Sequence, residues 1–311
     1  MGSSKSAKPV RRIPQAVHAV RILLRPQHRG PILAAVVVCA ALAGLLYAWQ
    51  RWGEAGLDPA EYTVTQDRIL VTPQPKWIHA DVKAEVIRSA GAAQLNLRDP
   101  QLVEALAAAF TLHPWVEKVV RVQKHYPARV EVELEYRRPV AAVEVASQNE
   151  PGLLFIDAQG VLLPSADFAQ GQAKEFLRIA AGNETPAGVY GTPWGSERIA
   201  GAARVAAAWE DIGDGAIKRW QTLKLYRIVP LQSSSGDLSY ELRTQTDVRI
   251  VWGAAPGGEA TDEPSPEQKI ATLEHHVADK GPLDRENAPA TIDLRQNLSA
   301  AKNARGSSLP R

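Results

Sequence analysis

The sequence predicts an α+β protein that is anchored to a membrane by a single helix. Three observations support this fold class. An uncharged apolar run of 18 residues lies near the N-terminus, from Ile32 to Trp49. Two runs of alternating apolar and charged residues, 115–123 and 129–136, are typical of strands with one buried face. Apolar residues at helical spacing recur before and after these two runs.

The apolar run predicts a membrane-spanning helix at 32–52. At about 1.5 Å per residue, the uncharged part is roughly 27 Å long, close to the hydrocarbon thickness of a bilayer. Residues 1–31 carry seven Lys and Arg side chains and no acid, whereas the other 29 of the 36 bases and all 34 acids follow. The positive-inside rule therefore predicts a cytoplasmic N-terminus and an exterior remainder. The alternative is a signal peptide cleaved after the small residues at 41–43.

The basic tail, 1–31, is interpreted as the determinant of this topology, with contact to anionic lipid as the alternative role. The single cysteine, Cys39, lies inside the apolar run, so the exterior part has no disulfide. None of the seven histidines has the spacing of a metal site with an acid or cysteine nearby. Neither a hydrolase nucleophile motif nor a phosphate-binding loop is present. We therefore expect no catalytic residue, metal, cofactor, small-molecule substrate or nucleic acid.

A linker is predicted at 53–67, with an approach strand as the alternative for 53–66, and a first exterior module follows at 68–139. Asp81 and Asp99 are expected to cap its two helices, Gly91 to end the first, and Pro114 to stop the second. The apolar residues of the second alternating run form one face, which the helices are expected to cover. The predicted elements are a strand at 68–72, helices at 81–91 and 99–112, and strands at 115–123 and 129–136 that pair as a hairpin.

A second exterior domain is predicted at 140–296, and a flexible C-terminal tail at 297–311. Asp157 is interpreted as a turn residue rather than a catalytic acid, because Asp is favoured in such turns. The predicted elements are a strand at 140–145, two short strands within 153–164, a helix at 196–212, strands at 223–229, 239–244 and 248–252, a helix at 267–278 and a last strand at 291–294.

Several local strings resemble the FtsQ/DivIB family of bacterial cell-division proteins, and they stand in the family's order. They are PWV from Pro114, YPARVEVELEYRRPVA, LLFIDAQGVLLP, VRIVWG followed by EQKIATL, and TIDLR. The resemblance covers nearly the whole chain, from the basic tail to the last strand. It implies an FtsQ-type POTRA domain (strand-helix-helix-strand-strand) at 68–139. A mixed β domain with flanking helices is then implied at 140–296.

The resemblance also implies a function. It implies a non-enzymatic scaffold of the divisome, in the cell inner membrane at the division septum, that recruits the bitopic partners FtsB and FtsL and so influences septal peptidoglycan synthesis. In the family the terminal strand is a partner edge that is used by strand addition. This role transfers to Thr291, Ile292, Asp293, Leu294 and Arg295, and Arg219 resembles part of a basic stretch near the partner site.

Two departures from the family pattern bear on the detailed partner contacts. Gln296 stands where an aromatic often follows, and Thr72-Pro73-Gln74-Pro75 replaces a glycine after the first strand. Two other functions stay open: a membrane-anchored exterior enzyme such as a cell-wall hydrolase, and a POTRA-containing envelope-assembly factor. Arg137 and Arg138 are expected either to fix a hinge between the two domains or to meet a partner. The acids at 131, 133 and 135 are interpreted as a solvated strand face rather than a binding stripe.

Overall fold

The chain divides into two compact units, Met1–Tyr62 and Thr63–Arg311. The basic tail up to residue 28, the first part of the predicted linker and the predicted C-terminal tail lie outside the described residues. The computed structural model describes residues 29–52, 59–91, 95–146, 152–169, 171–210, 218–285 and 288–296.

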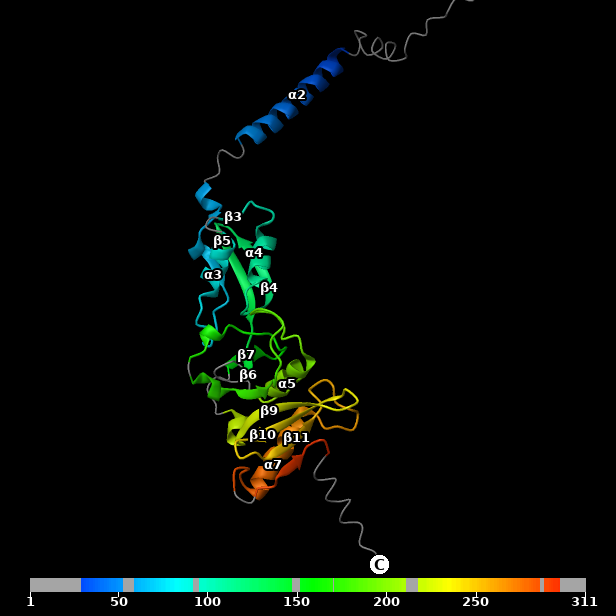
Figure 1. Cartoon of the computed structure of the whole chain (residues 1–311). Coiled ribbons are helices and arrows are strands. Elements are labelled where there is room, and N and C mark those ends of the chain that lie inside the picture. The colour runs from blue at the N-terminus through cyan, green and yellow to red at the C-terminus, as the bar shows by residue number, and fades with distance from the viewer. Residues whose placement is uncertain are drawn as a thin grey trace, which may run out of the picture. The chain divides into compact units, whose positions relative to one another are not determined.

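The first unit contains the helix α2 (Arg29–Trp52), which begins three residues before the predicted start (Figure 1). Its segment Leu33–Gln50 is apolar and unburied. Among the helices that the structure describes, it is the one that is long and apolar enough to cross a membrane. This helix is consistent with a single-pass membrane protein, although a signal sequence passes the same test of length and composition.

The second unit begins with a three-stranded sheet and two helices, in the predicted chain order (Figure 1). The strand order is β2-β5-β4, with β2 parallel and β4 antiparallel to β5. The elements are β2 (Ile69–Val71), α3 (Val82–Ser89), α4 (Leu102–Thr111), β4 (Val116–His125) and β5 (Arg129–Tyr136).

The alternation along β5 gives the sheet one apolar and one charged face. Its inward valines pack in one cluster with residues of α3 and α4, such as Phe110. On the other face, Glu133 pairs with Arg121 at 3.1 Å and Glu131 pairs with His125 at 3.2 Å, across from β5 on β4. These cross-strand pairs favour the interpretation of the acidic run as a solvated strand face.

Two details of this module differ from the predicted elements. Thr63–Val64, predicted as a linker or an approach strand, forms the strand β1 and pairs with the short strand β3 (Leu95–Asn96), which the sequence did not indicate. Helix α4 begins two residues after the predicted Pro100, with Gln101 as its N-cap. The reason is that Asp99 Oδ1 accepts a hydrogen bond from the Gln101 N–H at 2.8 Å and so forms a turn before the helix.

The rest of the second unit is a seven-stranded mixed sheet of order β12-β11-β10-β9-β8-β6-β7. Pairing is parallel between β6 and β8, β8 and β9, and β11 and β12, and antiparallel elsewhere. The strands are β6 (Pro139–Val145), β7 (Gly152–Asp157), β8 (Leu177–Ala180), β9 (Leu225–Gln232), β10 (Leu238–Thr244), β11 (Arg249–Gly253) and β12 (Thr291–Asp293).

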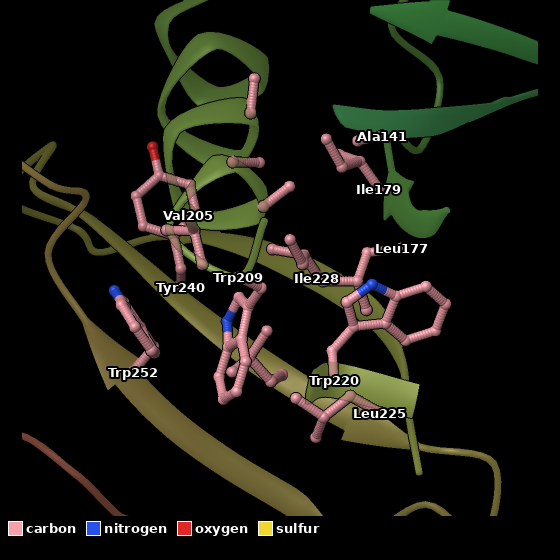
Figure 2. Packing of buried hydrophobic residues seen from close by; sticks show 14 of the residues in the cluster. Ala141, Leu177, Ile179, Val205, Trp209, Trp220, Leu225, Ile228, Tyr240 and Trp252 are labelled. Carbon is pink, nitrogen blue, oxygen red and sulfur yellow. The ribbon is translucent and has the colours of Figure 1, made fainter. Parts of the chain in front are cut away.

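One face of this sheet is covered by α5 (Glu197–Ala207) and α7 (Pro266–Lys280), which share its apolar core. In Figure 2, Trp209 lies between α5 and the strands, with Trp252 and Trp220 on either side of it. The ring centroids of Trp209 and Trp252 are 5.8 Å apart. Aromatic side chains of this size dominate the energetics of a core, so they fix the helices to the sheet.

In this second part, apart from short 3₁₀ helices, the sequence missed two elements and misassigned one. β8 and the one-turn helix α6 (Arg219–Thr222) were not predicted. The second short strand predicted before Pro164 is reduced to isolated bridges, in which Ile156 pairs with Leu162 and Val161 pairs with Pro193.

The Asp157 turn is present as predicted. The Asp157 carboxylate accepts hydrogen bonds from the backbone N–H groups of Gln159 and Val161, at 3.0 and 2.8 Å. Gly160 then takes a φ of +76°, which favours glycine. The turn role of Asp157 is therefore confirmed.

Arg137 and Arg138 join the three-stranded module to the seven-stranded sheet. Arg137 Nη1 lies 2.6 Å from Asp157 Oδ2, and the carboxylate is almost fully buried. Arg138 Nη2 lies 3.2 Å from Glu210 Oε2, after α5. Both arginines therefore contact the following domain, which favours the interdomain role among the two predicted alternatives.

The same junction contains a shared apolar core. Phe155, Leu163 and Phe176 of the second domain cluster with the buried residues of the three-stranded module. Trp115 Nε1 donates a hydrogen bond to Asp167, and the Ala80 N–H donates to the same carboxylate at 3.0 Å. The two parts of the second unit are therefore packed together and are not joined by a bare linker.

Candidate functional site: the outer edge of β12

β12 is one of the two edge strands of the seven-stranded sheet, and β7 is the other. It pairs in parallel with β11, so that Thr291 lies opposite Arg249 and Ile292 lies opposite Ile250. Among the residues that the structure describes, no strand pairs with the other side of β12. The predicted partner strand therefore lies at an edge of the sheet.

The hydrogen bonds to β11 show which backbone groups of this edge point outwards. The Arg249 N–H donates to the Ala290 C=O at 3.1 Å, and the Leu294 N–H donates to the Val251 C=O at 2.9 Å. In a parallel pair, alternate residues bond to one neighbour. The backbone N–H and C=O groups of Thr291 and Asp293 therefore point away from β11.

The five predicted strand residues divide by side chain into two groups. Ile292 and Leu294 are buried in the core with α7, at 4% and 1% exposure. Thr291, Asp293 and Arg295 lie on the opposite face by the alternation of the strand. Ile292 and Leu294 therefore anchor the strand, and the other three form the surface that a partner meets.

Asp293 and Arg295 form an ion pair that ends the strand. Arg295 Nη2 lies 2.6 Å from Asp293 Oδ2, and Arg295 Nε lies 3.0 Å from Asp293 Oδ1. The Arg295 N–H also donates to Asp293 Oδ1 at 3.0 Å. These hydrogen bonds hold the pKa of the Asp293 carboxyl below its ordinary value and raise the pKa of Arg295. The open backbone edge therefore stops at Asp293.

A buried ion pair supports the adjacent end of β11. Lys269 of α7 is fully buried, and its Nζ lies 2.6 Å from Glu263 Oε1 and 5.0 Å from the centroid of the Trp252 ring. The same carboxylate accepts a hydrogen bond from the Ala254 N–H at 2.9 Å. The pair thereby ties α7 and the preceding loop to β11.

Gly253 is required at this position. Its φ of +94° is unfavourable for other residues, and a Cβ there would lie 2.1 Å from Glu263 Oε1 and 2.9 Å from Arg295 Cγ. Gly253, Lys269 and β12 lie in separate strings of the sequence. In the structure they are close together around Glu263 and Arg295.

Arg219 is placed away from this group. It lies on α6, and its guanidinium contacts both carboxylate oxygens of Glu274 on α7, at 2.9 and 3.1 Å. This pair joins α6 to the helix that leads into β12. It lies on the helix-covered face of the sheet, whereas Asp293 and Arg295 lie on the other face.

Within the described ranges, no group of three or more His, Cys, Asp or Glu side chains is arranged to hold a metal ion. No protein-family model matches the chain, and a search of the curated proteins found no match. The open edge of β12 offers outward backbone N–H and C=O groups to a partner.

The ion pair between Asp293 and Arg295 predicts a measurable change in pKa. Replacing Arg295 by Gln removes the guanidinium charge and donors and leaves the backbone N–H in place, so we expect the pKa of Asp293 to rise toward 3.8, its ordinary value. In the parent protein, the contribution of the pair to stability is present above the unfolded-state pKa and is lost as the pH falls through the lower folded-state pKa. A carboxyl carbon NMR titration of both proteins measures this difference, and equal titration midpoints would contradict it.

The buried Lys269–Glu263 pair predicts a stability defect. Lys269→Met leaves the mostly buried Glu263 carboxylate without its cation, which costs about 3–5 kcal/mol in the free energy of unfolding. Urea denaturation of the full chain in detergent micelles measures this cost. Lys280→Met, on the exposed last turn of α7, is the matched control and should change stability by less than about 0.5 kcal/mol. Adding Glu263→Gln to Lys269→Met should restore part of the loss, and a stable single variant would argue against the role of the pair.

Proposed function

We propose that this chain is a non-enzymatic, membrane-anchored scaffold of the bacterial divisome, of the FtsQ/DivIB type. Its proposed task is to recruit FtsB-like and FtsL-like bitopic partners by strand addition at β12 and so to influence septal peptidoglycan synthesis. The single observation that carries this proposal is the open edge of the terminal strand. It lies in the string TIDLR, which the family resemblance marked as the partner edge.

The domain plan supports the same proposal. The order β2, α3, α4, β4, β5 matches the strand-helix-helix-strand-strand order of an FtsQ-type POTRA domain. The seven-stranded sheet would then be the β domain. The apolar helix α2 supplies the single membrane span, with the basic tail on the cytoplasmic side and the second unit outside the cytoplasm.

Strand addition is physically suited to this edge. The outward N–H and C=O groups of Thr291 and Asp293 offer a row of donors and acceptors to an extended segment. Each hydrogen bond contributes only about 0.5–1.5 kcal/mol net, so side-chain contacts must add to the affinity. Because Asp293 occupies the Arg295 N–H, the partner strand should pair along Thr291–Asp293 and extend toward the residues before it.

A proline substitution tests the role of the outward N–H directly. Thr291→Pro removes an N–H that points away from β11, so pairing between β11 and β12 should persist while partner capture falls. Thr291→Val keeps the N–H and is the matched control. The measurement is co-purification of an FtsB-like partner with the full chain from membranes. Unchanged capture by Thr291→Pro would contradict strand addition at this edge.

Localisation tests the cellular part of the proposal. A fluorescent fusion of the full chain should collect at midcell in dividing cells, and Thr291→Pro should still insert in the membrane. Uniform membrane fluorescence of the parent fusion would count against a divisome role. Lysis zones from the purified full chain on peptidoglycan gels would instead support the wall-hydrolase alternative.

A further inference from the structure

Four arginines form a row across the face of the seven-stranded sheet that α5 and α7 leave uncovered. In strand register, Arg178 of β8 stands opposite Arg227 of β9, and Arg243 of β10 stands between Arg227 and Arg249 of β11. Their neighbours in sequence, Leu177, Ile228, Leu242 and Ile250, belong to the core beneath the helices, so the arginines point to the opposite face. We call these four residues the arginine row.

Like charges directly opposite one another destabilise a sheet, so the arginine row requires compensation. Glu144 of β6 pairs with the row members on β8 and β9, at 3.4 and 2.7 Å. Glu241 of β10 pairs with the members on β10 and β11, and Asp247 pairs with the member on β10 at 3.2 Å. Within the described part of the chain, three carboxylates thus face four guanidinium groups.

The arginine row keeps hydrogen-bonding capacity after this compensation. Each guanidinium has five N–H donors, and because the Nε atoms of Arg227 and Arg243 are buried, a partner would contact the terminal Nη groups. All four side chains remain partly exposed, between 28% and 48%. The guanidinium groups of Arg178 and Arg227 also lie 4.9 and 5.7 Å from the centroid of the Tyr226 ring, which helps to hold them in place.

The spacing of the arginine row fits a helical partner better than an extended one. Neighbouring strands are about 4.8 Å apart, so the row extends over about 14 Å from first to last. On an α-helix, side chains at i, i+3, i+7 and i+10 share one face and extend over about 15 Å. On an extended strand, side chains on one face recur about every 6.7 Å, which differs from the spacing of about 4.8 Å between neighbouring arginines of the row. Four carboxylates at these helical positions therefore have nearly the same spacing as the four arginines. Each arginine can bind a carboxylate through two parallel hydrogen bonds.

We propose that the arginine row is a docking surface for a partner helix with acidic side chains at i, i+3, i+7 and i+10, lying across β8 to β11. The row ends at Arg249, opposite Thr291, so this surface borders the β12 edge. Docking on the row does not require strand addition. A partner that uses both surfaces gains from the higher effective concentration of its second contact.

The test uses the full chain in detergent micelles and two dye-labelled, alanine-based helical peptides. One carries glutamates at i, i+3, i+7 and i+10, and the other has the same composition with the glutamates spread around the helix. Fluorescence anisotropy should show tighter binding of the striped peptide. The double variant Arg178→Gln, Arg249→Gln should weaken its binding about tenfold or more, because it removes both ends of the row.

Control variants separate docking from general charge and from unfolding. Arg204→Gln removes an arginine of similar exposure on α5, which pairs with Glu197 on the helix-covered side, and should leave binding unchanged. The double Lys variant of Arg178 and Arg249 keeps the charge and should bind between the parent and the Gln variant. If thermal unfolding shows that the double Gln variant is not folded, the double Lys variant replaces it in the binding measurement.

Three results would overturn the docking surface. They are equal binding of the two peptides, an equal loss in Arg204→Gln, and equal competition by vesicles of phosphatidylglycerol, which would indicate general anion binding. Thr291→Pro should still bind the striped peptide, so a failure of strand addition and a failure of the arginine row are distinguishable.

Discussion

The parallel pairing of β12 with β11 is the interaction on which the open edge of the sheet depends. It requires a crossover, which α7 provides, and that crossover places the last strand outside all the others. The Lys269–Glu263 pair fixes the start of the crossover at the end of β11, and Ile292 and Leu294 fix its end in the core. β12 is held by its pairing with β11 and by the core side chains of Ile292 and Leu294. Its outward N–H and C=O groups therefore have fixed positions.

The two faces of the seven-stranded sheet differ in composition: one is apolar and covered by helices, and the other is charged. The apolar face packs α5 and α7 around Trp209 and Trp252 and holds the sheet together. The other face carries the arginine row and the ion pair of Asp293 and Arg295, so it is charged and open to contact. At β6 and β7 the same sheet joins the three-stranded module through Arg137 and a shared core. The proposed scaffold role would benefit from such a joint, because a fixed module positions a partner better than a loosely tethered one.

Much of the fold could be predicted because periodicity and caps are local. The alternation in β5 gave its bounds, and the residues of β12 were predicted within one position. β8 was missed because its four residues alternate between buried and partly exposed positions over too short a stretch to be recognised as a strand. At the candidate site, the resemblance indicated the strand, but the pairing partner of Arg219 depends on packing. The arginine row depends on the register of four strands that are distant in sequence, so no local pattern contains it.

In the proposed function, a partner strand completes the sheet at β12. Hydrogen–deuterium exchange of the full chain in detergent micelles, with and without an FtsB-like partner, tests it most directly. We expect slower exchange at Thr291 and Asp293 in the complex, with no change at β7 on the opposite edge, because only the outward amides of β12 gain acceptors. Protection at other elements with unchanged exchange in β12 would contradict it.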